Sequence, residues 1–93
     1  MILERVELTS KPGQEAAFAA AFAEGLPLLI GKGGGNAGRY GRGVENPDKF
    51  VLLVEWDSIE AHKLFIGSPP HQAFGQLIGP HVAGAVVEHF EIA

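Results

Sequence analysis

Residues 44–62, VENPDKFVLLVEWDSIEAH, combine a turn with the strongest strand signal in the chain. The turn is centred on Asn46-Pro47-Asp48, where proline presets φ and the flanking side chains can hydrogen-bond to their own backbone. The segment that follows, Phe50 to Trp56, is rich in aromatic and β-branched residues, which favour strands. The stretch therefore predicts a β-hairpin whose second arm, 50–56, is a central strand.

This predicted strand is apolar on both of its faces. Alternation puts Phe50, Leu52, Val54 and Trp56 on one side and Val51 and Leu53 on the other. An antiparallel sheet with one wet face should instead alternate apolar with polar residues. The rest of the chain supplies helices for one face only, so we expect a second copy of the chain to cover the other, giving a homodimer through the sheet face.

Two short helices and a last strand are predicted after the hairpin. Asp57 can cap the first helix, with Glu60 three residues later as in a capping box. Ser68 can cap the second helix, which has a proline in its first turn and ends at Gly79-Pro80. Residues 82–92 alternate in a half-apolar pattern on each side, which predicts the fourth strand.

A strand and a helix are predicted at the start of the chain. Residues 2–9 alternate, and one face holds Ile2, Glu4, Val6 and Leu8. Ser10 can cap an alanine-rich helix that begins near residue 11, in which two phenylalanines one turn apart anchor a single face. Gly25 and Pro27 are expected to end this helix before residue 30.

The glycine-rich run 31–43, GKGGGNAGRYGRG, has the composition of a phosphate-binding loop. Such a loop must follow a strand and open a helix, because its backbone N–H groups converge on the anion at a helix N-terminus. This run follows a helix and leads into a hairpin, so the context excludes a phosphate loop. We expect a flexible connection through Gly35 and a weak second strand from about Ala37, with a role in gating a pocket or shaping a dimer edge.

The predicted order of elements is β-α-β-β-α-β, with the second helical region split in two. This order is typical of an α+β, ferredoxin-like fold, in which helices pack on one face of a four-stranded antiparallel sheet. No linker or internal repeat interrupts the 93 residues, so we expect a single domain, 1–93.

Composition excludes several functional classes. The net charge of -4 gives no basic field for nucleic acid, and without cysteine there is no thiolate nucleophile or zinc–thiolate site. No apolar run reaches the roughly 18 residues of a membrane span, so we expect a cytoplasmic protein without a membrane partner.

Residues 44–62, together with Phe65 and the helix start Ser68–Phe74, resemble the antibiotic biosynthesis monooxygenase family of dimeric α/β barrels. The most specific part is Glu55-Trp56-Asp57-Ser58 followed by Glu60-Ala61-His62. The resemblance covers nearly the whole chain and implies a homodimer packed sheet against sheet, with a pocket between sheet and helices in each subunit. Some members oxidise polycyclic phenols to quinones with O₂ and no flavin, haem or metal. Others degrade haem, take part in signalling pathways, or have no assigned activity.

The resemblance implies that Trp56 and His62 lie in this pocket as catalytic residues. Trp56 would wall the ring of an aromatic phenol or hydroquinone, while His62, with an ordinary pKa of about 6.5, would hydrogen-bond or deprotonate its hydroxyl group. The residues expected to bind the substrate are Tyr40, Arg42, Phe65, His71 and Phe74. The predicted function is a cofactor-independent monooxygenase that uses O₂ on a small aromatic substrate.

Other functions and other roles remain open at this point. The chain can be a dimeric binding or accessory protein that holds a small molecule without turnover, or a proton-transfer enzyme with His62 as its base. The aromatic side chains also have structural alternatives. Trp56 can be a core residue and His62 a packing residue. His81 can lie in a loop, and His89 on the surface or at a dimer contact.

The family comparison also disfavours haem degradation. Aligned through Trp56, the places of the haem-binding Asn, Trp and His fall near Glu4, Phe65 and Gly75. The quinone-forming members carry a polar amide where this chain has Leu52, which weakens the link to their specific activity. The four histidines lack the tight spacing of metal ligands on one helix, so no metal site is predicted.

Overall fold

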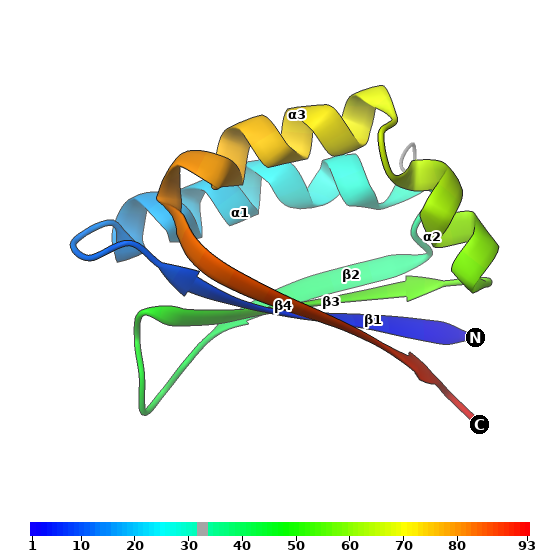
Figure 1. Ribbon diagram of the computed structural model, residues 1–93, viewed down its shortest axis with the longest axis horizontal. Helices are drawn as coiled ribbons and strands as arrows, with labels where there is room; N and C mark the ends of the chain where they lie inside the picture. Colours follow the sequence, from blue (N-terminus) through cyan, green and yellow to red (C-terminus); the bar gives the residue numbers. More distant parts are fainter. Residues whose placement is uncertain (32–33) are drawn as a thin grey trace.

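A four-stranded antiparallel sheet carries all of the described α-helices on one face (Figure 1). The structure is a computed structural model that describes residues 1–31 and 34–93. Its strands are β1 (Ile2–Ser10), β2 (Ala37–Arg42), β3 (Lys49–Trp56) and β4 (Val82–Glu91). Its helices are α1 (Glu15–Leu29), α2 (Ile59–Phe65), α3 (Pro69–Ile78) and the 3₁₀ turn η2 (Gly79–His81). The α+β, ferredoxin-like fold predicted from the sequence is confirmed.

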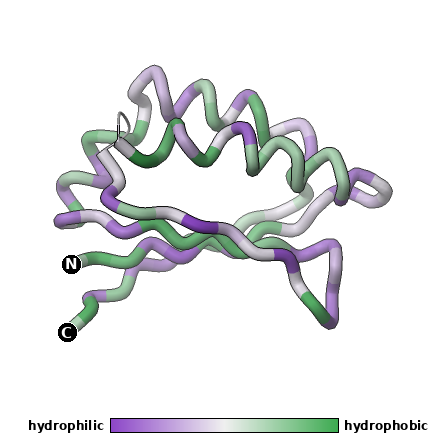
Figure 2. The backbone as a smooth tube through the Cα atoms, turned by 180° about the vertical axis from the view of Figure 1, so that it is seen from behind, coloured by the Kyte–Doolittle hydropathy of each residue, from purple (hydrophilic) through white to green (hydrophobic). Residues whose placement is uncertain are grey.

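The strand order in the sheet is β2-β3-β1-β4, so the first and third strands are central. The register pairs Val6 with Leu52 on β3 and with Val87 on β4, which puts these three side chains on the same face. This is the helix-covered face, and it holds Phe50, Leu52, Val54 and Trp56, as the alternation of β3 predicts. Figure 2 shows hydrophobic segments in both the helix layer and the sheet, as expected for two layers that share a core.

The largest fully buried side chains of the core are aromatic residues of α1 and β3. Phe18 and Phe22 of α1 are fully buried and stack with ring centroids 4.8 Å apart. Phe18 also meets Phe50 of β3 at 4.8 Å. Aromatic pairs at these separations add about 0.5–1.5 kcal/mol each beyond the burial of their area. These contacts fix α1 over the sheet.

The beginning of α1 differs from the prediction. The helix starts at Glu15 rather than near residue 11, and Ser10 is the buried last residue of β1 rather than a helix cap. The intervening residues form a turn in which Gln14 N–H donates to Lys11 O at 3.1 Å and Gly13 has φ of 77°. Pairing of Ser10 with Val82 of β4 therefore outweighs its capping preference.

Gly25 and Pro27 lie inside α1 instead of ending it, although the helix does end before residue 30 as predicted. Gly25 is buried where α1 crosses α3, and a Cβ placed on it would meet Phe74 Cδ1 at 2.9 Å. The missing side chain thus lets the two helices approach closely. Packing against α3 offsets the low helix propensity of glycine.

The two short helices begin close to their predicted positions, with one change of cap. Ser58, not Asp57, caps α2: its side chain accepts a hydrogen bond from Ala61 N–H at 3.1 Å. Asp57 instead accepts from Asn36 Nδ2 at 2.7 Å. Ser68 caps α3 as predicted and accepts from His71 N–H at 3.4 Å.

The hairpin and the second half of the glycine-rich run are placed as predicted. β2 begins at Ala37 and pairs antiparallel with β3, and Lys49 N–H donates to Asn46 O at 2.9 Å to close the turn. The first half of the run includes residues 32–33, which lie outside the described residues, so the expected flexible connection is described only in part. Gly35 N–H donates to Leu29 O at 3.0 Å, which ties the end of this segment back to α1.

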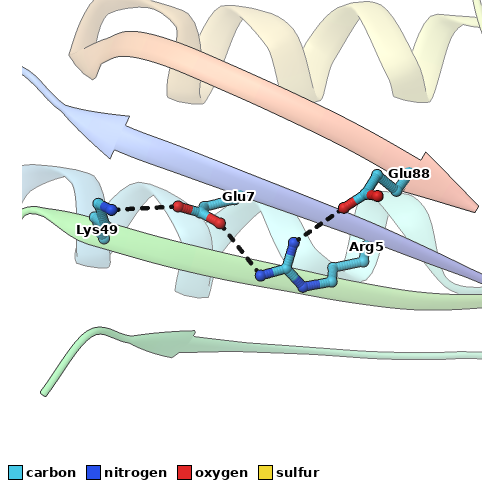
Figure 3. A network of polar contacts seen from close by, with 4 residues as sticks. All are labelled: Arg5, Glu7, Lys49 and Glu88. Atoms are coloured by element: carbon cyan, nitrogen blue, oxygen red, sulfur yellow. Dashed lines mark hydrogen bonds and ion pairs between the residues drawn. The ribbon is translucent and has the colours of Figure 1, made fainter.

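The second face of the sheet carries no helix from the described part of the chain (Figure 1). It combines apolar side chains, among them Leu3, Val51, Leu53, Val86 and Phe90, with a group of ion pairs. Figure 3 shows this group: Arg5 bridges Glu7 at 3.2 Å and Glu88 at 3.4 Å, and Lys49 lies 3.5 Å from Glu7. Arg5 and then Lys49 lower the pKa of the Glu7 carboxyl group. We call this side of the sheet the open face.

None of the helices described in residues 1–31 and 34–93 is long and apolar enough to cross a membrane.

Candidate functional site

A cavity of about 200 Å³ lies between the helix-covered face of the sheet and the helices α2 and α3. Most of its wall is apolar, and its polar lining residues are Glu4, His62 and His71. The remaining lining residues are Val6, Leu8, Leu29, Leu52, Phe65, Phe74, Gly75, Ile78 and Val87. Val87 lies on the edge strand β4 and is 52% exposed, so the cavity reaches the surface beside this strand. The arrangement provides an apolar chamber with a few polar groups, which is the usual form of a small-molecule site.

Glu4 brings a carboxyl group into the buried face of β1. It is only 9% exposed, and Val6 and Leu8 follow it on the same face. The indole Nε1 of Trp56 donates a hydrogen bond to Glu4 Oε1 at 3.0 Å. Without such donors the burial of a carboxylate would cost several kcal/mol, so Trp56 is one reason that Glu4 is tolerated here.

His62 supplies a second partner for Glu4 from the helix layer. It lies on α2 and is 7% exposed, and its Nε2 is 3.4 Å from Glu4 Oε1. One face of its ring stacks on Trp56, with centroids 4.8 Å apart and an interplanar angle of 25°. His62 is therefore held both by stacking and by a polar contact, and it does not point into solvent.

His89 completes the polar cluster from the edge strand. Its Nε2 lies 2.8 Å from His62 Nδ1, and β4 places it directly opposite Glu4 in the sheet register. Glu4, His62 and His89 thus form a connected series from β1 through α2 to β4. Both ring nitrogens of His62 are engaged by this series, one with each neighbour.

The surroundings of His62 favour its neutral form. Burial lowers its pKa below the ordinary value of 6.5; the Glu4 carboxylate opposes this by raising the pKa, and His89 and His71 lower it further. A neutral imidazole carries one N–H, so one nitrogen donates and the other accepts. Because an ionised carboxylate can only accept, Glu4 favours a proton on Nε2, and His62 Nδ1 then accepts from His89 Nε2–H.

The other residues expected at the site divide into two groups. Phe65, His71 and Phe74 line the cavity together with His62. Gly67 N–H donates to His71 Nδ1 at 3.0 Å, which leaves Nε2 of a neutral His71 as a donor for a ligand. Trp56 is fully buried beneath His62 and supports the cavity wall rather than lining it.

Tyr40 and Arg42 lie on the helix-covered face, but the structure does not bring them to this cavity. Tyr40 stacks on Phe22 with centroids 5.2 Å apart. Arg42 Nε donates to Pro47 O at 2.7 Å, and its guanidinium lies 5.6 Å from the centre of the Phe50 ring. Both side chains close the β2 side of the core.

Glu4 and His89 are the polar residues of the site that the sequence alone did not identify. Glu4 interrupts an otherwise apolar strand face of Ile2, Val6 and Leu8, and a carboxylate at such a position needs a buried partner. That pattern could have marked Glu4. His89 has no comparable signal, because its importance depends on contact with a residue 27 positions away.

The cavity is unsuited to haem. Glu4, Phe65 and Gly75, the positions aligned with haem-binding residues, do line it. However, Phe65 and Gly75 have no ligating side-chain atom, and a volume of about 200 Å³ lies below the range of about 300–1,000 Å³ for pockets that hold drug-sized ligands. Across the described residues, no group of three or more His, Cys, Asp and Glu side chains is arranged to hold a metal ion.

Comparison with known proteins agrees with the fold. The family model for antibiotic biosynthesis monooxygenases matches residues 1–77. The chain belongs to the antibiotic biosynthesis monooxygenase family. A relative in Bacillus subtilis (strain 168), the uncharacterized protein YczJ, is 32% identical over 93 residues, which are 98% of each chain.

Solved structures of the antibiotic biosynthesis monooxygenase family have the same architecture. One is a candidate antibiotic biosynthesis monooxygenase from Bordetella bronchiseptica, with 29% identity and a TM-score of 0.90 over 99% of this chain and 96% of that one. Another is SnoaB, a cofactor-independent oxygenase from Streptomyces nogalater. It has 14% identity and a TM-score of 0.83 over 98% of this chain and 91% of that one, a likeness that shows the fold alone.

Proposed function

We propose that this protein is a cytoplasmic, cofactor-independent monooxygenase that oxidises a small phenol or hydroquinone with O₂. The observation that supports this most directly is the apolar cavity whose polar wall contains a buried carboxyl group in contact with an imidazole. A phenol must lose its hydroxyl proton before it reacts readily with O₂, and these are the groups that can bind and take up that proton. Membership of the family and the likeness to SnoaB add support.

The proposed reaction needs no external reductant. One atom of O₂ enters the ring, the other leaves as water, and the aromatic substrate becomes a quinone. The hydrogens that form water come from the hydroxyl group and the ring carbon that is oxidised, and all the electrons come from the substrate. The apolar wall, which includes Leu52, Phe65 and Phe74, would exclude water from around the substrate anion.

The size of the cavity favours a substrate with a single ring. An engineered protein cavity of about 150 Å³ holds benzene, so about 200 Å³ accommodates one ring with small substituents. Polycyclic phenols would require the helix layer to move. The donor that His71 can offer through Nε2 suits a ring with a second oxygen, and this favours hydroquinones over simple phenols.

Oxygen uptake measures this activity directly. The wild-type protein would be mixed with hydroquinone, methylhydroquinone, phenol and anthrone, and uptake would be compared with autoxidation of each compound alone. We expect uptake with the single-ring hydroquinones and less with anthrone. As a matched control, His81→Gln changes a histidine outside the cavity, which contacts Gln14, and should leave the rate unchanged. Rates equal to autoxidation across the whole panel would refute the proposal.

A second candidate is a binding or accessory protein that holds the same class of ligand without turnover. The observation in its favour is Leu52, an apolar residue on the cavity wall where the quinone-forming members carry an amide. A ligand that raises the melting temperature while no product forms would favour this candidate. A proton-transfer enzyme would instead exchange deuterium into its substrate without oxygen uptake.

The homodimer belongs to the same proposal. On the open face, no helix from the described residues covers Leu3, Val51, Leu53, Val86 and Phe90, whereas the opposite face of the sheet is covered by the helices. A second copy packed on the open face would bury these side chains and would leave the cavity on the other side of each sheet. The mixed charges around Arg5 and Glu7 could then pair across the interface as well as within each subunit.

A further inference from the structure

The three residues of the series, Glu4, His62 and His89, differ in their access to a ligand. Glu4 and His62 line the cavity, whereas His89 lies on the exposed edge strand β4 behind them. His62 has Nε2 beside Glu4 at 3.4 Å, Nδ1 beside His89 at 2.8 Å, and one ring face on Trp56. No ring nitrogen of His62 is left to take a proton from a ligand.

In Glu4, one of the two carboxylate oxygens is not used by these contacts. The contacts from Trp56 and His62 both end on Oε1. Within the described residues, no buried side-chain oxygen or nitrogen is left without a hydrogen-bond partner. Among the described residues no contact is made with the second oxygen, Oε2, of this residue that lines the cavity. Oε2 is thus the carboxylate oxygen that these contacts leave for a ligand hydroxyl group.

We propose that Glu4 is the catalytic base of this site, and that His62 and His89 are positioning residues that hold its carboxylate in the reactive arrangement. His89 Nε2–H donates to His62 Nδ1, which fixes the proton of His62 on Nε2, the nitrogen that lies 3.4 Å from Glu4 Oε1. Glu4 Oε2 then takes the hydroxyl proton of a bound phenol. The O–H bond of the ligand breaks, an O–H bond forms on Glu4, and the electron pair remains on the phenolate oxygen.

This assignment rests on the proposed function for its substrate, but the tautomer of His62 is a property of the free protein. Other titratable groups near His62 are His71 on α3, together with Glu4 on β1 and His89 on β4. Among these, only Glu4 lines the cavity with an acceptor oxygen that the described contacts leave unused. In this assignment His62, which the resemblance implied as the base, supports the base instead.

Two measurements test the assignment separately. The first is ¹⁵N NMR of the histidine rings in the ligand-free, full-length protein at pH 7.5. We expect His62 to carry its proton on Nε2 in the wild type and to become a mixture of tautomers in His89→Ala, with His89→Gln, whose amide can still donate, restoring the wild-type signal. A proton on His62 Nδ1 in the wild type would overturn the proposal, whether or not any substrate is found.

The second measurement is steady-state oxygen uptake with the best hydroquinone. Glu4→Gln keeps the size of the side chain and an oxygen that can accept from Trp56, but it removes the base, so we expect kcat to fall about 100-fold or more with little change in KM. Glu4→Asp, which retains a displaced carboxylate, should lie between this variant and the wild type. The matched control is Glu24→Gln, an exposed carboxylate on α1, which should keep the wild-type rate.

The outcomes distinguish this assignment from the proposed function. A folded Glu4→Gln protein with the wild-type kcat would overturn the role of Glu4 and leave the monooxygenase intact. Failure of the wild type to consume oxygen above autoxidation would refute the monooxygenase and the catalytic role of Glu4 together. The melting temperature of each variant identifies any loss of rate that comes from unfolding.

Discussion

Trp56 Nε1 donates a hydrogen bond to Glu4 Oε1 at 3.0 Å, although 52 residues separate them in the sequence. The two residues belong to the neighbouring strands β3 and β1, on the face that the helices cover. The bond makes a buried carboxyl group tolerable, and the same indole stacks beneath His62. Stability and the candidate site therefore depend on the same tryptophan.

Replacing Trp56 with phenylalanine should lower the free energy of unfolding by at least about 1.5 kcal/mol. A hydrogen bond to a charged group contributes about 1.5–3 kcal/mol, and the smaller ring adds a cavity term. Urea denaturation measures the loss. In the matched double-mutant cycle with Glu4→Leu, whose side chain cannot accept from Trp56, the two changes should couple by about 1 kcal/mol or more, and additive effects would contradict the contribution assigned to this bond.

The stability of the protein should fall as the pH drops below about 6.5. Burial lowers the pKa of His62 in the folded state, so the unfolded chain binds the proton more readily than the folded one. The contribution of neutral His62 to stability is fully present above the pKa that His62 has in the unfolded state. It is lost as the pH falls through the pKa that His62 has in the folded state. Chemical denaturation from pH 8 to pH 5 would show the decline.

The matched variants for this pH dependence are His62→Gln and His81→Gln. The first removes the buried imidazole, so its stability should change less steeply over the same pH range than that of the wild type. The second removes a histidine that contacts Gln14 outside the cavity, and it should retain the decline. Equal slopes in the wild type and His62→Gln would assign the decline to other groups.

Gly25→Ala and Gly75→Ala should have opposite effects although both glycines are helical. In α1, a Cβ on Gly25 would meet Phe74 Cδ1 at 2.9 Å, so we expect a loss of about 1–3 kcal/mol and a changed cavity wall. In α3, a Cβ on Gly75 would meet nothing within 4 Å, and the better helix propensity should add up to about 1 kcal/mol. Thermal denaturation compares the pair, and stabilisation by both substitutions would refute the close approach of α1 and α3.

Local patterns were sufficient for most of the fold and for part of the site. The alternation of β3 identified the buried face that ends at Trp56, and the Ser68 cap identified the start of α3, because both signals lie within a few residues. The start of α1 was misplaced because Ser10 has a β-sheet partner, Val82, that no local pattern reveals. The Glu4–His62–His89 series was not predicted either, because its residues come from three elements that only tertiary packing brings together.

Leu53→Glu should separate the proposed homodimer without unfolding the monomer. Leu53 lies on the open face, with Arg5 and Arg39 as its register partners on the two neighbouring strands. A carboxylate between two arginines is tolerated at an exposed sheet surface, whereas in a dry interface its desolvation costs several kcal/mol. Analytical ultracentrifugation at micromolar concentration should thus show a dimer for the wild type and a folded monomer for the variant. The matched control, Leu64→Glu, places the same charge at an 84% exposed position on α2 and should remain a dimer. A monomeric wild type, or an undisturbed Leu53→Glu dimer, would show that the open face is not the interface.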